Sequence, residues 1–391
     1  MAYRKALGWR VLPAILLASP VPAAPPPAAP AGQTAPAAGL AAVDAVMARA
    51  LAAGELAGAV VGVMRDGRIL ATKGYGLSDI EDGQPVRADT IFRIGSITKQ
   101  FTTALLMMLV ERGQLSLDDP ISRFFPDFPK AEGITVRHLL NHTSGIHSYT
   151  DRRFVETRAW REHDTAQMLS YIAGQDDLTD FPVGQDYRYN NSGYVLAGAI
   201  VEKLTGTSYA AALQAMILTP LGLRDTAYDD ERLVVPRRAK GYAPLDGRLV
   251  HPAPLSVSVA GSAGALRSTA ADMLRWHAAL LGGRVVKPES LARMIEPSRL
   301  ADGRLISQVH ARDAQRGPPA DYGLGLEVGL RDGRRVVGHY GTINGFNACL
   351  YSFPDEHVSI VLLTNTEGAA NRLFWPVADA WLNQGNREQG K

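Results

Sequence analysis

The stretch RRVVGHYGTINGFNACLYSFPDEHVSIVLLTN, residues 334–365, decides the fold. It contains three apolar runs rich in β-branched and aromatic residues, and turn-forming pairs interrupt it at Asn344-Gly345 and at Pro354-Asp355. Such runs separated by turn residues are typical of strands that follow one another in an antiparallel sheet. The segment GAANRLFWPVADAWLNQ, residues 368–384, then predicts a helix after the strands.

Matching strands are predicted near the beginning of the chain. Residues 57–76, AGAVVGVMRDGRILATKGYG, are two apolar runs joined at Asp66-Gly67, which is a strong hairpin signal. Strands near both ends of the chain around a helical middle predict an α+β fold. In this fold the N- and C-terminal strands form one antiparallel sheet, flanked by helices, with a helical lobe inserted. The predicted helices of the middle span 96–112, 134–142, 165–174, 192–204, 208–218 and 269–282.

Composition and charge argue against some classes of function. The 391 residues are 46% hydrophobic and 20% charged, which is enough apolar material for a large core. The 41 basic residues nearly balance the 39 acidic ones, so the net charge of +2 offers no electrostatic surface for nucleic acid. No run reaches the ~18 apolar residues that a membrane-spanning helix needs. We therefore expect no nucleic-acid partner and no stable membrane anchor.

The first residues are typical of an exported protein. Basic residues precede a short apolar core and small residues, so residues 1–24 predict a signal peptide; the alternative is a disordered or membrane-tethered leader. Residues 25–39 are rich in proline and alanine and predict a linker. A folded domain over 40–385 and a tail over 386–391 are expected to follow. Since Cys349 is the single cysteine, we expect no internal disulfide, and we expect a periplasmic or secreted protein.

The stretch RIGSITKQFTTALLMML, residues 93–109, holds a candidate nucleophile. Ser96 and Lys99 are three residues apart, so on a helix their side chains lie on the same face. A serine hydroxyl needs a neighbouring base to become a good nucleophile, and a lysine can serve if burial lowers its pKa. The apolar residues that follow predict such burial, and a helix start offers backbone N–H groups to a developing oxyanion. The alternative is that Ser96 only caps the helix.

Two further stretches carry polar groups that suit such a site. Tyr189 and Asn191 lie just before an apolar helix, and a tyrosine whose pKa a nearby lysine ammonium lowers can exchange protons with a serine. The alternative is a core tyrosine and a capping asparagine. His339 and Gly341 lie on a predicted strand, where a glycine often marks the close approach of a ligand. The alternative there is a strand end with an incidental histidine.

Three motifs in order resemble those of a known family. IGSITK at 94–99, YNN at 189–191 and HYG at 339–341 resemble the S-x-x-K, Y-x-N and K/H-T/S-G motifs of the serine penicillin-recognising enzymes. The stretches TVRHLLNHTSGI, TPLGLRDT, GALRSTAADMLRW and YGLGLEV resemble the class C β-lactamase and D-alanyl-D-alanine carboxypeptidase branch, which also includes esterases and D-aminopeptidases. The resemblance covers roughly residues 41–385.

The resemblance implies a serine hydrolase that forms an acyl-enzyme and uses no metal or cofactor. Ser96 would be the acylated nucleophile and Lys99 its proton acceptor. Tyr189 would act as acid and base in acylation and deacylation.

The resemblance also implies the substrate-binding residues. Asn191 would orient the substrate amide, and His339 would stand where many relatives have lysine. The backbone N–H groups of Ser96 and of Thr342, which follows Gly341, would form the oxyanion hole.

Two departures from the family pattern concern the substrate. His339 is mostly neutral at neutral pH, and Tyr340 replaces a small hydroxyl residue that would contact the carboxylate of a penicillin or of D-alanyl-D-alanine. The resemblance implies that carboxypeptidase-like relatives tolerate histidine at this position, whereas a dedicated β-lactamase of this branch usually has lysine, which argues against efficient cephalosporinase activity. We expect turnover of anionic substrates to rise as the pH falls toward ~6, where His339 gains charge. Nearby basic residues that would compensate are Arg331, Arg334 and Arg335.

The substrate class stays open at this point. The main interpretation is a D-alanyl-D-alanine carboxypeptidase, penicillin-binding-protein-like or β-lactamase-like enzyme, acting on a peptidoglycan peptide or another small molecule, with β-lactams included. The first alternative is a carboxylesterase or D-aminopeptidase on the same scaffold. The second is a non-catalytic penicillin-recognising envelope protein.

Two other patterns have simpler interpretations. AGSAG at 260–264 is a relaxed G-x-S-x-G around Ser262, but it lacks the strand-turn-helix context of a nucleophile elbow and predicts a glycine-rich loop. His138 and His142 are four residues apart without the glutamate of H-E-x-x-H, which favours helix packing or capping over zinc binding.

Overall fold

An antiparallel sheet of eight strands forms the centre of the folded domain. The structure is a computed structural model that describes residues 37–309 and 321–389. Within these residues the strand order is β3-β2-β1-β13-β12-β11-β10-β9, so strands from the two ends of the chain meet where β1 pairs with β13. The predicted α+β fold is therefore confirmed.

Turn residues set the limits of the strands. The predicted turns at Asp66-Gly67 and Asn344-Gly345 join β1 to β2 and β11 to β12, and Gly67 and Gly345 have φ angles of +73° and +81° that glycine adopts without strain. The patterns above do not predict β9 and β10, which are short and lack a continuous apolar run. The strands are β1 (Gly58–Arg65), β2 (Arg68–Asp79), β3 (Gln84–Pro85), β9 (Asp321–Tyr322), β10 (Glu327–Arg331), β11 (Arg334–Ile343), β12 (Phe346–Phe353) and β13 (Val358–Thr364).

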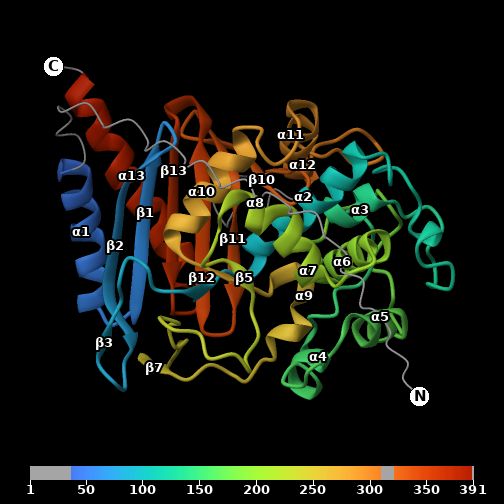
Figure 1. Ribbon diagram of the computed structural model, residues 1–391, viewed down its shortest axis with the longest axis horizontal. Helices are drawn as coiled ribbons and strands as arrows, with labels where there is room; N and C mark the ends of the chain where they lie inside the picture. Colours follow the sequence, from blue (N-terminus) through green and yellow to red (C-terminus); the bar gives the residue numbers. More distant parts are fainter. Residues whose placement is uncertain (1–36, 310–320, 390–391) are drawn as a thin grey trace, which may run out of the picture. The chain divides into compact units, whose positions relative to one another are not determined.

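Different helices cover the two faces of the sheet (Figure 1). Helices α1 (Ala37–Ala52) and α13 (Ala369–Gln389) pack together on the face to which Val61 points. The neighbouring residue Val60 belongs to the other apolar cluster, which includes α10 (Ala270–Leu281). Because successive side chains of a strand point to opposite faces, β1 contributes to both clusters and is buried along nearly its whole length.

The helical lobe lies between β3 and β9 in the sequence. The predicted helices correspond to α2, α3, α5, α6, α7 and α10, whereas α1, α4, α8, α9, α11 and α12 were not predicted. The helices are α2 (Thr98–Glu111), α3 (Val136–Leu140), α4 (Arg152–Thr157), α5 (Thr165–Ala173), α6 (Asn191–Thr205), α7 (Tyr209–Leu213), α8 (Thr219–Leu221), α9 (Gly261–Gly264), α11 (Pro288–Ile295) and α12 (Ile306–Val309). A small sheet of β4 (Phe92–Arg93), β8 (Leu266–Ser268) and β5 (Ala227–Tyr228) and the pair β6 (Ala243–Leu245) and β7 (Arg248–Val250) complete it.

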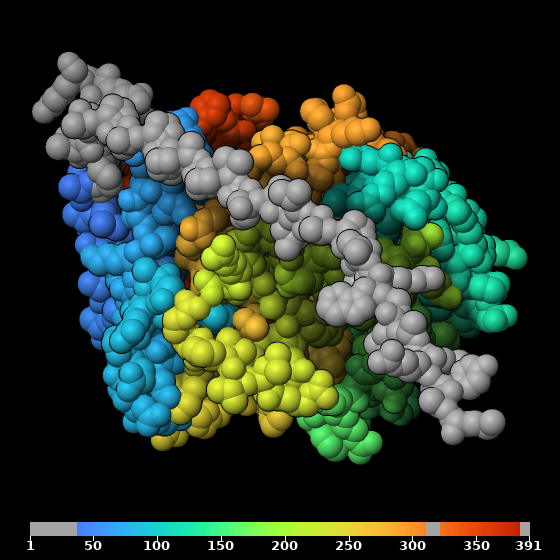
Figure 2. Space-filling view, viewed as in Figure 1, coloured from blue at the N-terminus to red at the C-terminus, as the bar shows by residue number. Residues whose placement is uncertain are grey.

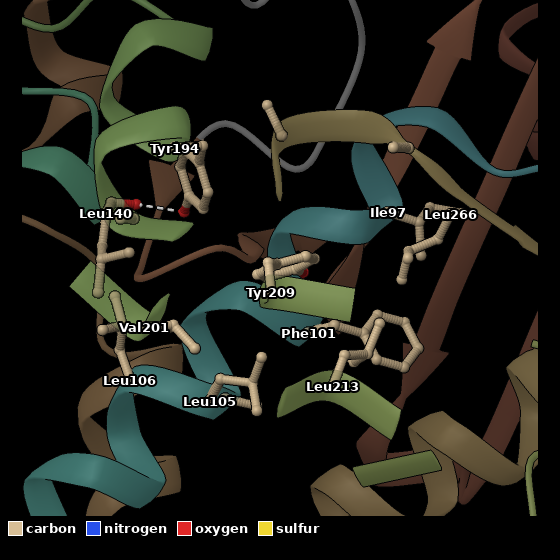
Figure 3. Packing of buried hydrophobic residues seen from close by; sticks show 14 of the residues in the cluster. Ile97, Phe101, Leu105, Leu106, Leu140, Tyr194, Val201, Tyr209, Leu213 and Leu266 are labelled. Atoms are coloured by element: carbon tan, nitrogen blue, oxygen red, sulfur yellow. Dashed lines mark hydrogen bonds between the residues drawn. The ribbon is translucent and has the colours of Figure 1, made fainter. Parts of the chain in front are cut away.

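Helix α2 is buried along most of its length. Figure 3 shows Phe101 and Leu105 of α2 close to Leu213 of α7, and Tyr194 of α6 beside Leu140. The Tyr194 hydroxyl donates a hydrogen bond of 2.7 Å to the carbonyl oxygen of Leu140. Because apolar side chains surround it, α2 carries its first-turn polar residues into the interior of the protein.

The surface in Figure 2 is formed partly by the segment between about residues 229 and 255, drawn in yellow. This segment contains β6 and β7 and the exposed side chains of Leu233 and Val234. No helix in the described ranges has the length and apolarity to cross a membrane.

The predicted leader falls outside the described residues. The signal peptide, residues 1–24, and the linker up to residue 36 therefore remain predictions. The last three residues assigned to the linker are already helical, because α1 begins at Ala37. At the other end α13 runs to Gln389, into the segment assigned to the tail.

Candidate active site

Ser96 lies in a turn between a short strand and a buried helix. Strand β4 ends at Arg93, and Gly95 has a φ of +52°, which lets the chain turn into the short 3-10 helix Gly95–Ile97 that leads into α2. The N-cap of α2 is Ile97, which makes no side-chain cap, so the interpretation of Ser96 as a helix cap is wrong. The Ser96 hydroxyl is therefore available for chemistry.

Lys99 is fully buried, and three oxygen atoms surround its amine. Nζ lies 3.0 Å from Ser96 Oγ, 2.8 Å from Asn191 Oδ1 and 2.8 Å from the carbonyl oxygen of Ala263. Burial holds the pKa of Lys99 well below its usual range, which favours the neutral amine. A neutral amine has two N–H donors and one lone pair. Because the amide and carbonyl oxygens can only accept, both donors go to them and the lone pair is left for the serine hydroxyl.

Tyr189 covers the lysine with its ring, whose centroid lies 4.8 Å from Lys99 Nζ. Its hydroxyl is buried and has no hydrogen bond of ordinary geometry to the described residues. Burial is the largest cause that raises the pKa of the phenol well above its usual range, and Tyr340 is the second. The Ser96 hydroxyl lowers this pKa by a smaller amount. The expectation that a lysine ammonium lowers this pKa is wrong, because the lysine is buried and favours its neutral form. The phenol therefore keeps its proton at neutral pH and is able to donate it.

Asn191 faces the same amine from the start of α6. The N-cap of α6 is Asn190, whose side chain accepts a hydrogen bond from the backbone N–H of Gly193. The alternative in which Asn191 caps the helix is therefore wrong. Its Oδ1 accepts from Lys99, and its Nδ2 donates to Thr150 Oγ1 at 3.2 Å. Asn191 thus fixes the position of the Lys99 amine, and hydrogen bonds at both Oδ1 and Nδ2 fix its own side-chain amide.

Strand β11 approaches the nucleophile turn through a glycine. A Cβ atom added to Gly341 would lie 1.9 Å from the carbonyl oxygen of Ile94 and 2.8 Å from the backbone nitrogen of Ser96. A Cβ on Gly95 would lie 2.7 Å from the backbone nitrogen of Thr342. Only glycines permit this contact, and it brings together the two backbone segments whose N–H groups form the predicted oxyanion hole.

His339 is fully buried beside these groups. Its Nδ1 donates to the carbonyl oxygen of Tyr340, so its Nε2 is an acceptor and takes a hydrogen bond of 2.9 Å from the Tyr322 hydroxyl. Burial, with a smaller contribution from Lys99, lowers the pKa of His339 to about 3. The predicted gain of turnover in mildly acidic solution is therefore wrong in its physical basis, because His339 stays neutral there.

The three arginines that were expected to compensate are engaged elsewhere. Arg331 pairs with Asp379 at 2.9 Å and lies over the ring of Trp375, on the side of the sheet covered by α13. The other two pairs are Arg334 with Glu356 and Arg335 with Asp355. These contacts hold the arginine side chains away from the role that the sequence suggested.

An aromatic cluster that the sequence patterns do not predict lies beside the candidate catalytic side chains. The ring centroid of His142 lies 4.4 Å from that of Tyr189, 5.3 Å from that of Tyr194 and 4.6 Å from that of Tyr322. The Nδ1 atom of His142 accepts a hydrogen bond of 3.0 Å from the backbone N–H of Asn190. Spacing within HLLNH or YGLGLEV gives no signal of these contacts, because the partners come from segments far apart in the sequence.

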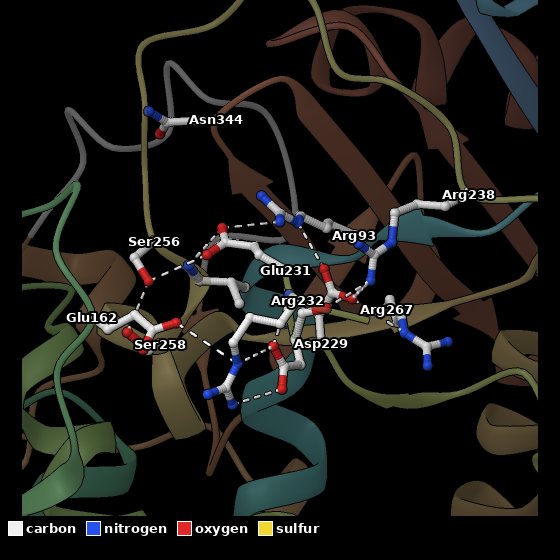
Figure 4. Close-up of polar contacts among 12 residues, drawn as sticks. Arg93, Glu162, Asp229, Glu231, Arg232, Arg238, Ser256, Ser258, Arg267 and Asn344 are labelled. Atoms are coloured by element: carbon white, nitrogen blue, oxygen red, sulfur yellow. Dashed lines mark hydrogen bonds and ion pairs between the residues drawn. The ribbon is translucent and has the colours of Figure 1, made fainter. Parts of the chain in front are cut away.

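A second buried polar cluster supports the strand that leads to Ser96 (Figure 4). Asp229 is fully buried and forms ion pairs with Arg93, Arg238 and Arg267. The Arg93 guanidinium also donates to Glu231 Oε1 at 3.1 Å. Since Arg93 and Arg267 stand opposite each other where β4 pairs with β8, the Asp229 carboxylate ties these two strands together.

Ser262 is a packing residue. Its hydroxyl donates to the carbonyl oxygen of Tyr194 at 2.8 Å, and a Cβ added to Gly198 would lie 2.1 Å from it. The glycine-rich loop nevertheless serves the site, because the next residue, Ala263, supplies the carbonyl oxygen that Lys99 contacts.

The two histidines of HLLNH also have structural partners. His138 completes the capping box of α3 with Thr135, and His142 belongs to the aromatic cluster. Across residues 37–309 and 321–389, no group of three or more His, Cys, Asp and Glu side chains is placed to hold a metal ion.

The chain is similar in sequence or in fold to several known proteins. The family model described as Beta-lactamase matches residues 43–380. Esterase EstB of Burkholderia gladioli is 34% identical over 388 residues, which span 88% of this chain and 95% of the esterase. Penicillin-binding protein 4* of Bacillus subtilis (strain 168) is 28% identical over 320 residues, which span 77% of this chain and 66% of that protein. The crystal structure of D-amino acid amidase from Ochrobactrum anthropi SV3 with D-phenylalanine has a TM-score of 0.75 at 25% identity, covering 88% of this chain and 99% of the amidase.

Proposed function

We propose that this chain, which belongs to the Beta-lactamase family, hydrolyses esters of small uncharged carboxylic acids through an acyl-enzyme on Ser96. The chain is a serine hydrolase, and its relatives include an esterase and a penicillin-binding protein. The proposal therefore concerns which substrate the site accepts.

The buried, neutral side chain of His339 is the observation that most favours an uncharged ester as the substrate. The resemblance to the penicillin-recognising enzymes implies that the residue at the position of His339 helps to bind the carboxylate of a penicillin or of a D-alanyl-D-alanine peptide. The neutral imidazole of His339, hydrogen-bonded to Tyr322, offers such a carboxylate no charge. Lys99 favours its neutral form as well. An ester without a charged group needs no such partner. The similarity to an esterase over nearly the full length of both chains supports the same substrate class.

The reaction follows from the contacts of the site. Ser96 Oγ attacks the ester carbonyl carbon and passes its proton to the lone pair of Lys99 Nζ. The backbone N–H groups of Ser96 and Thr342 stabilise the oxyanion, and such a donor typically contributes ~2.7–4 kcal/mol. The ester C–O bond then breaks, and Tyr189 donates its proton to the leaving alkoxide. The proton held by Lys99 returns the phenolate to the phenol, and water hydrolyses the acyl-enzyme by the reverse set of transfers.

A panel of chromogenic substrates tests the proposal. We expect kcat/KM for p-nitrophenyl butyrate to exceed that for nitrocefin and for D-alanine p-nitroanilide by ~100-fold or more, which corresponds to ~2.7 kcal/mol of transition-state discrimination. If nitrocefin or the D-alanine anilide is turned over as efficiently as the ester, the ester proposal fails and the β-lactamase or D-aminopeptidase alternative replaces it.

Two serine variants serve as matched controls. Ser96→Ala should lower ester hydrolysis by ~10⁴-fold or more, because loss of a nucleophile removes the acyl-enzyme. Ser262→Ala, the serine of the relaxed G-x-S-x-G pattern, should stay within ~5-fold of the parent. An unchanged rate in Ser96→Ala would point to the non-catalytic alternative for this site.

We also propose that the protein acts in the periplasm or outside the cell. The composition of residues 1–24 supports export. Cells that produce the full chain should release ester-hydrolysing activity on osmotic shock, whereas cells that produce residues 25–391 should retain it in the cytoplasm. Retention of both forms in the cytoplasm would contradict the proposal.

A further inference from the structure

A cavity lies between the sheet and the helices α10 and α11. It encloses about 640 Å³, a volume that accommodates a small molecule. Strands β10 to β13 and the end of β1 form one wall, and the two helices form the other. No residue assigned above to the Ser96 site lines it. Most of its lining is apolar and includes Leu281, Leu291, Ile295, Val328 and Val337.

A polar relay of three side chains interrupts this apolar lining. His277 Nδ1 lies 2.7 Å from Ser352 Oγ, which lies 2.6 Å from Ser359 Oγ. Val337, Ser352, Ser359 and Met64 stand opposite one another on four neighbouring strands, so their side chains share the face that α10 covers. The sheet therefore places two hydroxyl groups in the middle of an otherwise apolar wall.

The relay is not fully satisfied by the described residues. His277 is fully buried, and its Nε2 has no hydrogen-bond partner among them. A buried polar atom left unpaired is unfavourable, so packing alone does not account for a histidine at this position. Burial lowers the pKa of His277 to about 3, so the imidazole is neutral and favours an uncharged neighbour. Ser359 is half-buried and is the member of the relay most open to the cavity.

We propose that this cavity binds an uncharged, largely apolar small molecule whose single hydroxyl or carbonyl group hydrogen-bonds to the relay at Ser359. The apolar walls bury the body of the ligand, and the hydroxyl relay can reverse its direction, so it donates to a carbonyl or accepts from a hydroxyl. An anionic ligand fits less well, because Arg335 at the rim is already paired with Asp355. This site is independent of the ester hydrolysis proposed for Ser96.

Titration with the neutral fluorophore prodan, which carries one carbonyl group on an apolar body, tests the site. In a Ser96→Ala background we expect saturable binding of one equivalent with blue-shifted emission. Ala278→Trp fills the cavity from α10 and should weaken binding by ~10-fold or more. Ser359→Val removes the hydroxyl at nearly constant volume and should weaken it by ~3–10-fold, the value of one hydrogen bond.

The matched control is Ala271→Trp, which adds the same bulk two turns earlier on α10 and outside the cavity lining. It should leave prodan affinity within ~2-fold of the parent. The folding of each variant is checked by its ester hydrolysis when Ser96 is retained. If Ala278→Trp does not fold, the prodan affinity of Ser359→Val alone tests the proposal. Absence of saturable binding, or equal affinity in the parent and the folded cavity variant, would overturn the proposal.

Discussion

Lys99 and Asp229 are both fully buried ionisable side chains, and their surroundings give them opposite roles. The Lys99 amine contacts three neutral oxygen atoms, so burial is uncompensated and its pKa falls. The Asp229 carboxylate contacts three guanidinium groups, which balance its charge. A buried group without a counter-ion is poised to exchange a proton, whereas one with counter-ions holds structure together.

The largest effect should come from fixing a charge at position 99. Lys99→Arg places a guanidinium that cannot accept a proton beside Ser96, so we expect kcat/KM for p-nitrophenyl butyrate to fall by ~10⁴-fold. The rate should approach that of Ser96→Ala, while circular dichroism reports whether the variant is folded. If a folded Lys99→Arg protein keeps kcat/KM within tenfold of the parent, Lys99 is not the proton acceptor, and its contrast with Asp229 fails.

Removing the counter-charge in the other cluster should affect stability instead. Asp229→Asn leaves three partly buried arginines without their shared carboxylate and should lower the free energy of unfolding by ~3–5 kcal/mol, measured by urea denaturation. The neighbouring Asp230→Asn breaks only a surface pair with Arg232 and should leave the urea midpoint unchanged. Equal midpoints for the two variants would show that the Asp229 cluster is not structural.

The next effect concerns the proton donor. Tyr189→Phe keeps the ring over Lys99 but removes the hydroxyl, so kcat/KM should fall by ~10²-fold with little change in stability. Tyr194→Phe is the matched control, because its hydroxyl donates to the Leu140 carbonyl and has a structural role. That variant should lose ~1 kcal/mol of stability and keep its activity. The reverse pattern would assign the acid to Tyr194.

A further effect is a pH dependence of stability. The pKa of Lys99 is lower in the folded protein than the usual 10.5, so between these two values the unfolded chain binds the extra proton. Stability therefore rises with pH in this window, by up to ~1.4 kcal/mol per pH unit. Lys99→Met lacks the titrating group, so the stability of the parent relative to this variant should increase as the pH rises toward the usual lysine pKa of 10.5. A pH-independent difference would mean that Lys99 is not shifted.

The sequence located the reacting groups better than it described their surroundings. Ser96, Lys99 and Tyr189 could be predicted because short motifs place them at helix starts, where local spacing determines geometry. The charge state of His339 could not, because it depends on burial and on a hydrogen bond from Tyr322. The same limit applies to His142, whose aromatic neighbours come from distant segments.

The fold shows the same division. The hairpin at Asp66-Gly67 and the strands 334–365 were predicted because turn residues separate clear apolar runs. The short β10 and helix α11 were not, because tertiary packing rather than an apolar run defines them. The assignment of the α6 cap to Asn190 likewise needed the structure, since Asn190 and Asn191 are equally good caps by type.

The most direct test of the central claim is the pH dependence of covalent labelling by diethyl p-nitrophenyl phosphate, followed by intact mass and peptide mapping. The account predicts one adduct, on Ser96, with a labelling rate that reaches its plateau well below the usual lysine pKa of 10.5. A rate that still rises tenfold per pH unit near pH ~10, or an adduct on another serine, would contradict a neutral Lys99 that activates Ser96.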